Sequence, residues 1–382
     1  MTPTTAPGAG GVGAEGINRL GYRLLDELEA EPPPRNLFLS PCSLAFCVAM
    51  ASNGAAGRTR EELVAALGAE GIDEQRLNGR FRDLRIEVEH PGHQLEVDLA
   101  NAVWGPPGTS FDAAFLQRVR EFYAAEARTL DMAGPAAAEL VNRWVSERTK
   151  GRIARLVSPD DLAAGPGCIL SNAIYFKGPW AARFDPGDSR TGPFTPPDGR
   201  RKEVQMMTRS GPYPYLETDE VQAVSLDYLG GNLSMYVVLP GEGTAPPPSR
   251  LEAWLPQLQR AQVALTLPRF SVTCELDLLR PLADLGLGGA FQPGADFSRM
   301  GLTGSSISAV RHTARLDVSE EGTEAAASTA VVIGRSLPRT RTMVVDRPFL
   351  LAIVDRRSGL LLFLGRITEP EPIPARSVAG GR

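Results

Sequence analysis

Lysine, histidine and cysteine are scarce in this chain of 382 residues. Only three of its 40 basic residues are lysines, at positions 150, 177 and 202, a balance typical of a GC-rich, bacterial genome. The four cysteines are Cys42, Cys47, Cys168 and Cys274. They show no C-x-x-C or metal-type spacing, so we expect buried thiols, without a disulfide framework or a metal site.

Signatures of catalysis are also missing. The sequence contains no H-E-x-x-H, P-loop or G-x-S-x-G motif. Gly8, Gly10 and Gly13 spell G-x-G-x-x-G, but they follow MTPTTAP rather than a strand, which indicates a flexible tail. His90 and His93 flank a Pro-Gly turn, which favours a surface loop over a metal site. We therefore expect no enzyme and no cofactor.

Strong positive charge and long apolar runs are absent as well. The net charge of −5 argues against nucleic acid or an anionic membrane as the main partner. The first residues show no basic region followed by an apolar run, so we expect no signal peptide. The longest apolar stretch, residues 37–51, is too short to span a bilayer. We expect a monomer; a cytoplasmic location is favoured and an extracellular one is compatible.

The periodicity of apolar residues predicts helices first and mostly strands afterwards. Helical spacing or capping signals predict helices within 17–30, 40–57, 59–68, 110–123 and 136–153. Alternating or continuous apolar runs predict strands within 95–105, 168–180, 221–241, 262–270, 307–322 and 342–367. This order indicates an α+β fold with one domain over residues 16–370, between a disordered tail of residues 1–15 and a flexible tail of residues 371–382.

Residues 320–339, EEGTEAAASTAVVIGRSLPR, combine a smooth strand-like run with an isolated Arg-Ser pair. If residues 323–333 form a strand, alternation places Thr323 on an uncharged face and Glu324 on the opposite face. No proline interrupts this run, so it can pair on both sides. Arg335 before Ser336 is the pattern that trypsin-like proteases cleave, because their specificity pocket carries a carboxylate.

Seven segments, in chain order, resemble the serpin family of protease inhibitors. They are FLSPCSLAFCVAMASNGAAGRT, VNRWVSERTKGRI, LSNAIYFKGPW, VQMMTRSGPYPY, NLSMYVVLPG, EEGTEAAAST and MVVDRPFLLAI. The resemblance covers residues 17–369. It implies a single large serpin domain with about three β-sheets, eight to nine α-helices and an exposed reactive-centre loop at about residues 322–346.

The resemblance also implies a mechanism and a partner. Inhibitory serpins act as suicide substrates: a serine protease forms a covalent acyl complex with the loop, which then inserts into the main sheet and traps it. The loop is similar to that of antithrombin, which assigns Arg335–Ser336 as the bond cleaved by a trypsin-like protease. This loop, however, has one residue fewer between Gly322 and the Gly-Arg-Ser-Leu segment than the antithrombin loop has. If the family's usual spacing is counted from Gly322, the residue before the cleaved bond is Ser336; if it is counted back from Pro348, that residue is Leu337. The rival interpretation is a non-inhibitory chaperone or binding protein with the same fold.

Three groups of residues match functional regions of the family. The hinge comprises Glu320, Glu321, Gly322, Thr323, Glu324, Ala325, Ala326 and Ala327. The shutter, a buried polar cluster beneath the strands that part, comprises Ser40, Ser43, Asn172 and His312. The breach, where the loop enters, comprises Trp180, Arg269 and Glu320, of which Glu320 and Arg269 are predicted ion-pair partners.

Some members of the family bind heparin through a basic helix. The comparable stretch here is EQRLNGRFRDLRIEVE, residues 74–89. Its four arginines alternate with acidic residues, a pattern typical of a solvated helix. We therefore expect no heparin site.

Overall fold

The structure is a computed structural model. It describes residues 13–373 apart from 32–34, 93, 133, 135, 163–166, 231, 303 and 323–339. Within these residues α1 begins at Ala14 and Glu371 pairs with Ser271, so regular structure extends slightly beyond the predicted limits of 16 and 370 at both ends.

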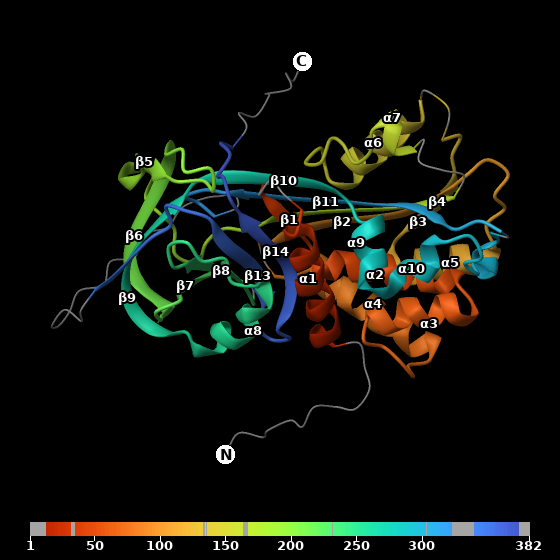
Figure 1. Cartoon of the computed structure of the whole chain (residues 1–382), viewed down its shortest axis with the longest axis horizontal. Coiled ribbons are helices and arrows are strands. Elements are labelled where there is room, and N and C mark those ends of the chain that lie inside the picture. Colours follow the sequence, from red (N-terminus) through yellow and green to blue (C-terminus); the bar gives the residue numbers. More distant parts are fainter. Residues whose placement is uncertain are drawn as a thin grey trace.

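The described strands form a five-stranded and a nine-stranded sheet (Figure 1). The five-stranded sheet has the order β10 (Phe270–Asp277), β11 (Ile307–Val318), β4 (Cys168–Lys177), β2 (Glu96–Gly105) and β3 (Glu126–Thr129). The nine-stranded sheet has the order β1 (Leu37–Leu39), β14 (Leu360–Ile367), β13 (Phe349–Asp355), β8 (Leu233–Pro240), β7 (Val221–Asp227), β6 (Lys202–Glu217), β9 (Gln259–Pro268) and β12 (Arg341–Val344), with β5 (Arg190–Phe194) paired to β6.

The sequence predicted about three sheets, and the hydrogen bonding of the described strands gives two. The reason is the length of β6, which has 16 residues. One part of β6, residues 206–215, pairs with β9, and residues 215–217 pair with β7. A single bent strand thus joins two groups of strands that would otherwise be separate sheets.

Six helices of ten residues or more and four of a single turn account for the α-helical part of the described chain. The long ones are α1 (Ala14–Glu29), α2 (Pro41–Gly54), α3 (Gly57–Ala66), α4 (Glu74–Glu89), α5 (Ala113–Tyr123) and α6 (Ala137–Arg148). The short ones are α7 (Pro159–Leu162), α8 (Leu251–Trp254), α9 (Leu279–Leu282) and α10 (Gly288–Phe291). The predicted helix at 136–153 ends early because Lys150 and Gly151 adopt left-handed backbone angles, with φ of 51° and 76°.

Both faces of the five-stranded sheet are covered. The helix α6 and the segment after it lie on one face, and α2 with its neighbouring helices lies on the other (Figure 1). Every residue of β4 from Cys168 to Phe176 is therefore buried, in agreement with its continuous apolar sequence. The helix α2 is buried on all sides, as its apolar sequence predicted. All four cysteines are buried free thiols.

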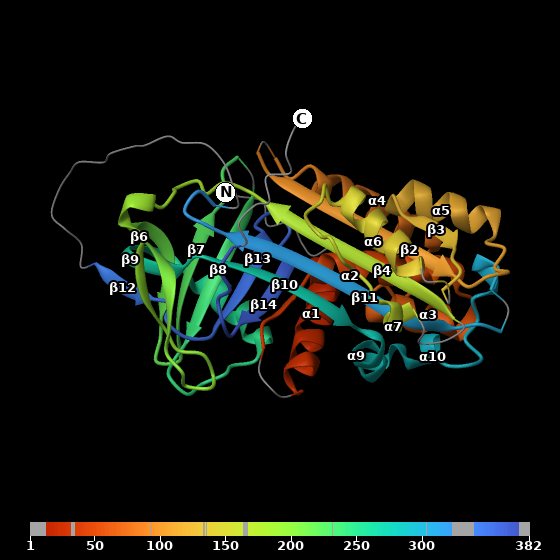
Figure 2. The same ribbon diagram turned by 90° about the horizontal axis from the view of Figure 1, so that it is seen from above.

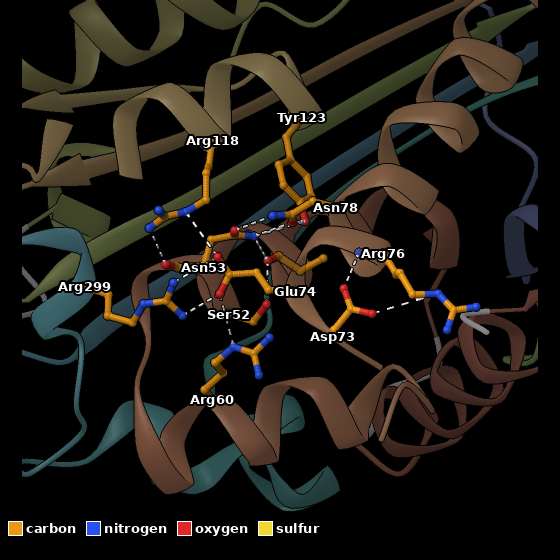
Figure 3. A network of polar contacts seen from close by, with 11 residues as sticks. Ser52, Asn53, Arg60, Asp73, Glu74, Arg76, Asn78, Arg118, Tyr123 and Arg299 are labelled. Atoms are coloured by element: carbon orange, nitrogen blue, oxygen red, sulfur yellow. Dashed lines mark hydrogen bonds and ion pairs between the residues drawn. The ribbon is translucent and has the colours of Figure 1, made fainter. Parts of the chain in front are cut away.

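A polar network joins the far end of α2 to the helices around it (Figure 3). Asn53 of α2, Asn78 of α4 and Tyr123 of α5 are buried and hydrogen-bonded to one another at 2.6–3.1 Å. Nearby, Glu74 pairs with Arg299 at 2.6 Å, and this hydrogen bond holds the pKa of Glu74 below its ordinary value. The network fixes the C-terminal end of α2, whose N-terminal end contributes to the site described next.

Candidate functional site

The site is built around the junction of β4 and β11, which run side by side through the molecule (Figure 2). The two strands are parallel, and residues 307–316 pair with residues 168–176; we call these residues the β4–β11 seam. The outer neighbours β10 and β2 are antiparallel to β11 and β4 respectively. A chain that leaves β11 through a tight turn would run antiparallel to β11 and, because β4 is parallel to β11, antiparallel to β4 as well.

Such a turn follows β11 directly. In residues 319–322, which we call the hinge turn, the backbone N–H of Ser319 donates to Gly322 O and the N–H of Gly322 donates to Ser319 O. Gly322 has φ of 108°, which L-amino acids with a side chain rarely adopt. A Cβ at Gly322 would lie 2.4 Å from Trp180 N and 2.5 Å from Gly178 O. The position therefore requires glycine on grounds of both backbone angle and space.

The predicted breach residues lie together at the hinge turn. The carboxylate of Glu320 accepts a hydrogen bond from Ser189 Oγ at 2.8 Å and lies 3.6 Å from Arg269 Nη1. Its side chain is only 8% exposed. Trp180 Nε1 donates to Ser319 O at 2.9 Å, and its ring stacks on Tyr228. The predicted ion pair is thus present. Ser189 was missed, because no sequence pattern connects a loop serine with a residue 131 positions away.

Replacement of Glu320 by lysine is expected to loosen the upper end of the β4–β11 seam. The variant loses the Ser189 and Arg269 contacts and places a second cation, at a side-chain position only 8% exposed, beside the half-exposed Arg269. We expect more polymer after mild heating, measured by size-exclusion chromatography. Glu321→Lys is the control, because Glu321 is exposed and the charge change is the same. Equal polymerisation of both variants would show that Glu320 does not hold the strands.

The four predicted shutter residues also meet, in the middle of the β4–β11 seam. Asn172 of β4 is the register partner of His312 of β11, and His312 Nδ1 lies 2.5 Å from Asn172 Oδ1. On the α2 side, Asn172 Nδ2 donates to Ser43 Oγ at 2.5 Å. The backbone N–H of Ser40 donates to His312 Nε2 at 3.1 Å. One hydrogen bond of this cluster therefore crosses between the two strands, and others tie both strands to α2.

Asn101 is a fifth member that the sequence did not reveal. It lies on β2 opposite Asn172 and accepts a hydrogen bond from Asn172 Nδ2 at 2.6 Å. Its side chain is buried. The available signal was an amide within the apolar strand LEVDLANAVWG, since a buried polar side chain requires a partner. The identity of that partner depends on the order of strands in the sheet.

The hydrogen bonds define the protonation state of His312. Because Ser40 N–H donates to Nε2, this nitrogen is unprotonated, and Nδ1–H donates to Asn172 Oδ1. Complete burial lowers the pKa of His312 to about 3. The ring is therefore neutral in the folded protein over the physiological pH range.

This pKa predicts acid sensitivity of the fold. The pKa of His312 in the folded state lies below the value of about 6.5 for an unfolded histidine, so its contribution is complete above pH 6.5. It is lost progressively as the pH falls from 6.5 toward 3, by up to about 1.4 kcal/mol per pH unit. Urea unfolding at pH 7.5, 6.5 and 5.0 should show a steeper decline for the parent than for His312→Gln. Parallel declines would contradict the neutral buried histidine.

The segment after α6 crosses the β4–β11 seam on the face opposite α2. On the β2 side, Lys150 Nζ pairs with Asp98 Oδ1 at 2.8 Å. On the β11 side, Arg311 Nη2 lies 3.1 Å from Asp161 Oδ1. A strand inserted at the seam would move the two sides apart by about 4.8 Å, the spacing of neighbouring strands. If the seam opened in this way, the two ion pairs could not both persist unless this segment moved.

The chain re-enters the described structure close to β12. Arg341 Nη1 lies 3.0 Å from Glu217 Oε2, and Gln222 Nε2 donates to Thr342 O at 3.0 Å. Hinge residues Thr323, Glu324, Ala325, Ala326 and Ala327 and the bond Arg335–Ser336 lie outside the described residues. Their roles stay predictions from the sequence.

The basic stretch 74–89 forms the helix α4, and several of its arginines pair with acids of the same region. Arg82 pairs with Asp83 at 3.0 Å, and Arg85 pairs with Glu89 at 2.8 Å. The charges thus alternate as the sequence predicted. No cluster of His, Cys, Asp and Glu suited to a metal occurs among the described residues. None of the helices in the described ranges has the length and apolarity needed to cross a membrane.

Comparison with known proteins agrees with this geometry. The family profile described as Serpin (serine protease inhibitor) matches residues 15–370. An uncharacterized serpin-like protein of Thermococcus kodakarensis is 36% identical over 93% of this chain and 85% of its own length. Leukocyte elastase inhibitor of Bos taurus is 33% identical over 92% of this chain and 98% of its own. Among solved structures, human thyroxine-binding globulin has a TM-score of 0.85 at 29% identity, covering 94% of this chain and 98% of that one.

Proposed function

This chain belongs to the serpin family of serine protease inhibitors, and we propose that it traps a trypsin-like serine protease as a suicide substrate with Arg335–Ser336 as the scissile bond. The observation that carries the proposal is the parallel β4–β11 seam, with the hinge turn at its end and a long, proline-free run immediately after it. This arrangement provides both a strand and the place that it can fill.

In the proposed reaction, the catalytic serine of the protease attacks the carbonyl carbon of Arg335. The bond between Arg335 and the nitrogen of Ser336 breaks, the new amine of Ser336 takes a proton, and an ester joins Arg335 to the protease. The peptide that ends at Arg335 is then no longer tethered to Ser336, although it still carries the protease. It remains attached to β11 through the hinge turn, so residues 323–334 can fold back along the β4–β11 seam.

The lengths agree with this movement. Residues 323–334 supply twelve residues, while β11 has 12 and β4 has 10. Insertion replaces one parallel ladder by two antiparallel ones, a net gain of about ten hydrogen bonds at about 1 kcal/mol each. The gain, on the order of 10 kcal/mol, matches the stability of an ordinary domain of about 5–15 kcal/mol. It is sufficient to make insertion irreversible once it has occurred, and trapping further requires that insertion be faster than hydrolysis of the ester.

The buried cluster fits a role as a gate in this movement. The His312–Asn172 hydrogen bond crosses the β4–β11 seam and must break when a strand enters. The side chains of His312 and Asn172 would then need hydrogen-bond partners on the inserted strand, because each buried polar group without a partner costs about 1–3 kcal/mol. The cluster therefore keeps the seam closed until the loop arrives.

A reaction with trypsin tests the proposal. We expect a complex that survives SDS and a released peptide that begins at Ser336. Cleavage without a complex would instead favour a non-inhibitory binding protein or chaperone. The structural similarity to thyroxine-binding globulin, a protein solved with a bound ligand, is the reason to distinguish this alternative from inhibition. Thermal stability after cleavage distinguishes the two, since an inserted loop should raise the melting temperature strongly and an uninserted loop should not.

A further inference from the structure

A charged hollow lies at the outer edge of the five-stranded sheet, away from the β4–β11 seam. It has a volume of about 430 Å³ and is formed by the end of α5, the edge strand β3 and the last turn of α6. A hollow of this size is in the range of small-molecule sites, about 300–1,000 Å³. Nothing in the proposed inhibitory reaction uses it.

Three arginines and one acid provide the charge of the hollow. Glu126 is the acid, and its side chain is 18% exposed. Arg148 Nη2 pairs with Glu126 Oε1, and Arg128 Nη2 lies 2.5 Å from Glu126 Oε2. Arg120 also lines the hollow and has no ion pair in the part of the chain that the structure describes. The four side chains together carry a net charge of +2 when all are ionised.

Glu126 remains ionised and orders the two guanidinium groups that it binds. Burial alone would raise its pKa, but the hydrogen bond from Arg148 and the charges of Arg128 and Arg148 outweigh burial and hold the pKa below its ordinary value. Each of these arginines contacts Glu126 through its Nη2 nitrogen. A guanidinium group has five N–H donors, so donors remain for a further acceptor. Fixed guanidinium groups of this kind suit the oxygens of phosphate, sulfate, sulfonate or carboxylate groups.

The remaining lining of the hollow is apolar. It consists of Leu116, Val119, Ala124, Ala125 and Ala127. Small side chains at three of these positions leave room for a flat or narrow body next to the charged rim. An inorganic ion would use the arginines alone, whereas a ligand with an apolar body would use both parts of the hollow.

We propose that this hollow binds a small organic anion, with its anionic group on Arg120 and Arg148 and its apolar body over the partly exposed Leu116 and Ala127. The ligand class is an aromatic or short acyl compound with one sulfonate, sulfate, phosphate or carboxylate group. The proposal does not depend on protease inhibition.

Isothermal titration calorimetry with 2-naphthalenesulfonate tests this assignment. We expect measurable binding to the parent protein, weaker binding of inorganic sulfate and of uncharged 2-naphthol, and at least a tenfold loss of 2-naphthalenesulfonate affinity in Arg120→Gln and in Arg148→Gln. Arg82→Gln is the matched control, because Arg82 and Arg148 have equal side-chain exposure of 46% and Arg82 lies on α4, outside the hollow.

Each other outcome overturns the proposal. No binding to the parent, or equal binding to the parent and both variants, would show that the hollow is not the site. An equal loss in Arg82→Gln would indicate non-specific attraction to a charged surface. Sulfate binding as tightly as 2-naphthalenesulfonate would rule out the apolar part. Arg120→Gln should not disturb folding, because Arg120 supports no ion pair in the described structure. If this variant changed the stability of the protein and not the affinity for 2-naphthalenesulfonate, Arg120 would only stabilise the C-terminal end of α5, and the proposal would fail.

Discussion

Replacement of Thr323 by arginine is expected to convert the protein from an inhibitor into a substrate of its target protease. In the proposed inserted strand, Thr323 comes directly after Gly322 and belongs to the inward-facing set, so its side chain must enter the β4–β11 seam first. The face of the sheet toward α2 is packed with buried apolar side chains, including Val318 at the end of β11. An unpaired guanidinium group there costs several kcal/mol, even after the structure relaxes.

Trapping is a race between insertion of the loop and hydrolysis of the acyl-enzyme. An increase of about 1.4 kcal/mol in the insertion barrier slows insertion about tenfold. Hydrolysis should therefore win in Thr323→Arg. We expect cleavage at Arg335 at the normal rate, release of active protease and no complex on SDS gels.

Glu324→Arg is the control for this prediction. The next residue in a strand points to the opposite face, and there the parent sequence already carries a charge. This variant should inhibit nearly as well as the parent. If both variants trap protease equally, the assignment of faces fails, and the insertion mechanism fails with it.

Replacement of Arg335 by alanine is expected to abolish trapping of trypsin-like proteases and leave the fold intact. The carboxylate in the protease's specificity pocket loses its charged partner. Loss of one partner of a buried charge pair costs about 2–5 kcal/mol, so the association rate constant should fall by roughly 30-fold to several thousand-fold. The rate of inhibition, measured with a chromogenic trypsin substrate, reports this change directly.

Arg339→Ala separates the scissile arginine from other arginines of the same loop. It removes the same charge four residues further on and should leave the rate unchanged. If Arg335→Ala inhibits trypsin at the parent rate, the assignment of the scissile bond is wrong. A released peptide that begins at Leu337 or Pro338 would mean that cleavage occurs at one of the positions selected by counting along the loop.

Much of the secondary structure followed from the sequence, because the pattern of apolar residues records which face of each element is buried. The buried helix α2, the continuous strand β4 and the closing hairpin of β13 and β14 all lie where periodicity predicted them. The errors were local or topological. The helix α6 ends early at the left-handed Lys150 and Gly151. The long strand β6 joins two groups of strands into one sheet, so the described strands form two sheets where the resemblance implied about three.

In the site, too, some residues were predicted from the sequence and others were found only in the structure. The hinge residues, the Arg335–Ser336 bond and the members of the shutter and breach came from sequence segments that resemble the family, and Gly322 carries its signal in its own residue type. Asn101 and Ser189 were not predicted, although they bind Asn172 and Glu320 directly. Each is separated from its partner by 71 or 131 positions, and only the order of the strands and the path of the loops determine such a distance.

The sequence by itself determined which segments are buried, and its proline-free run 323–333 predicts a strand able to pair on both sides, a prediction that lies outside the described residues. Only the tertiary structure decided that β4 and β11 are parallel neighbours, with His312 and Asn172 paired across them. The same holds for the hollow, where residues from α5, β3 and α6 surround Glu126. Local sequence sets backbone angles and the exposed face of an element. Which strand pairs with which depends instead on the packing of the whole chain, because the free energies of the possible pairings depend on residues far apart in the sequence.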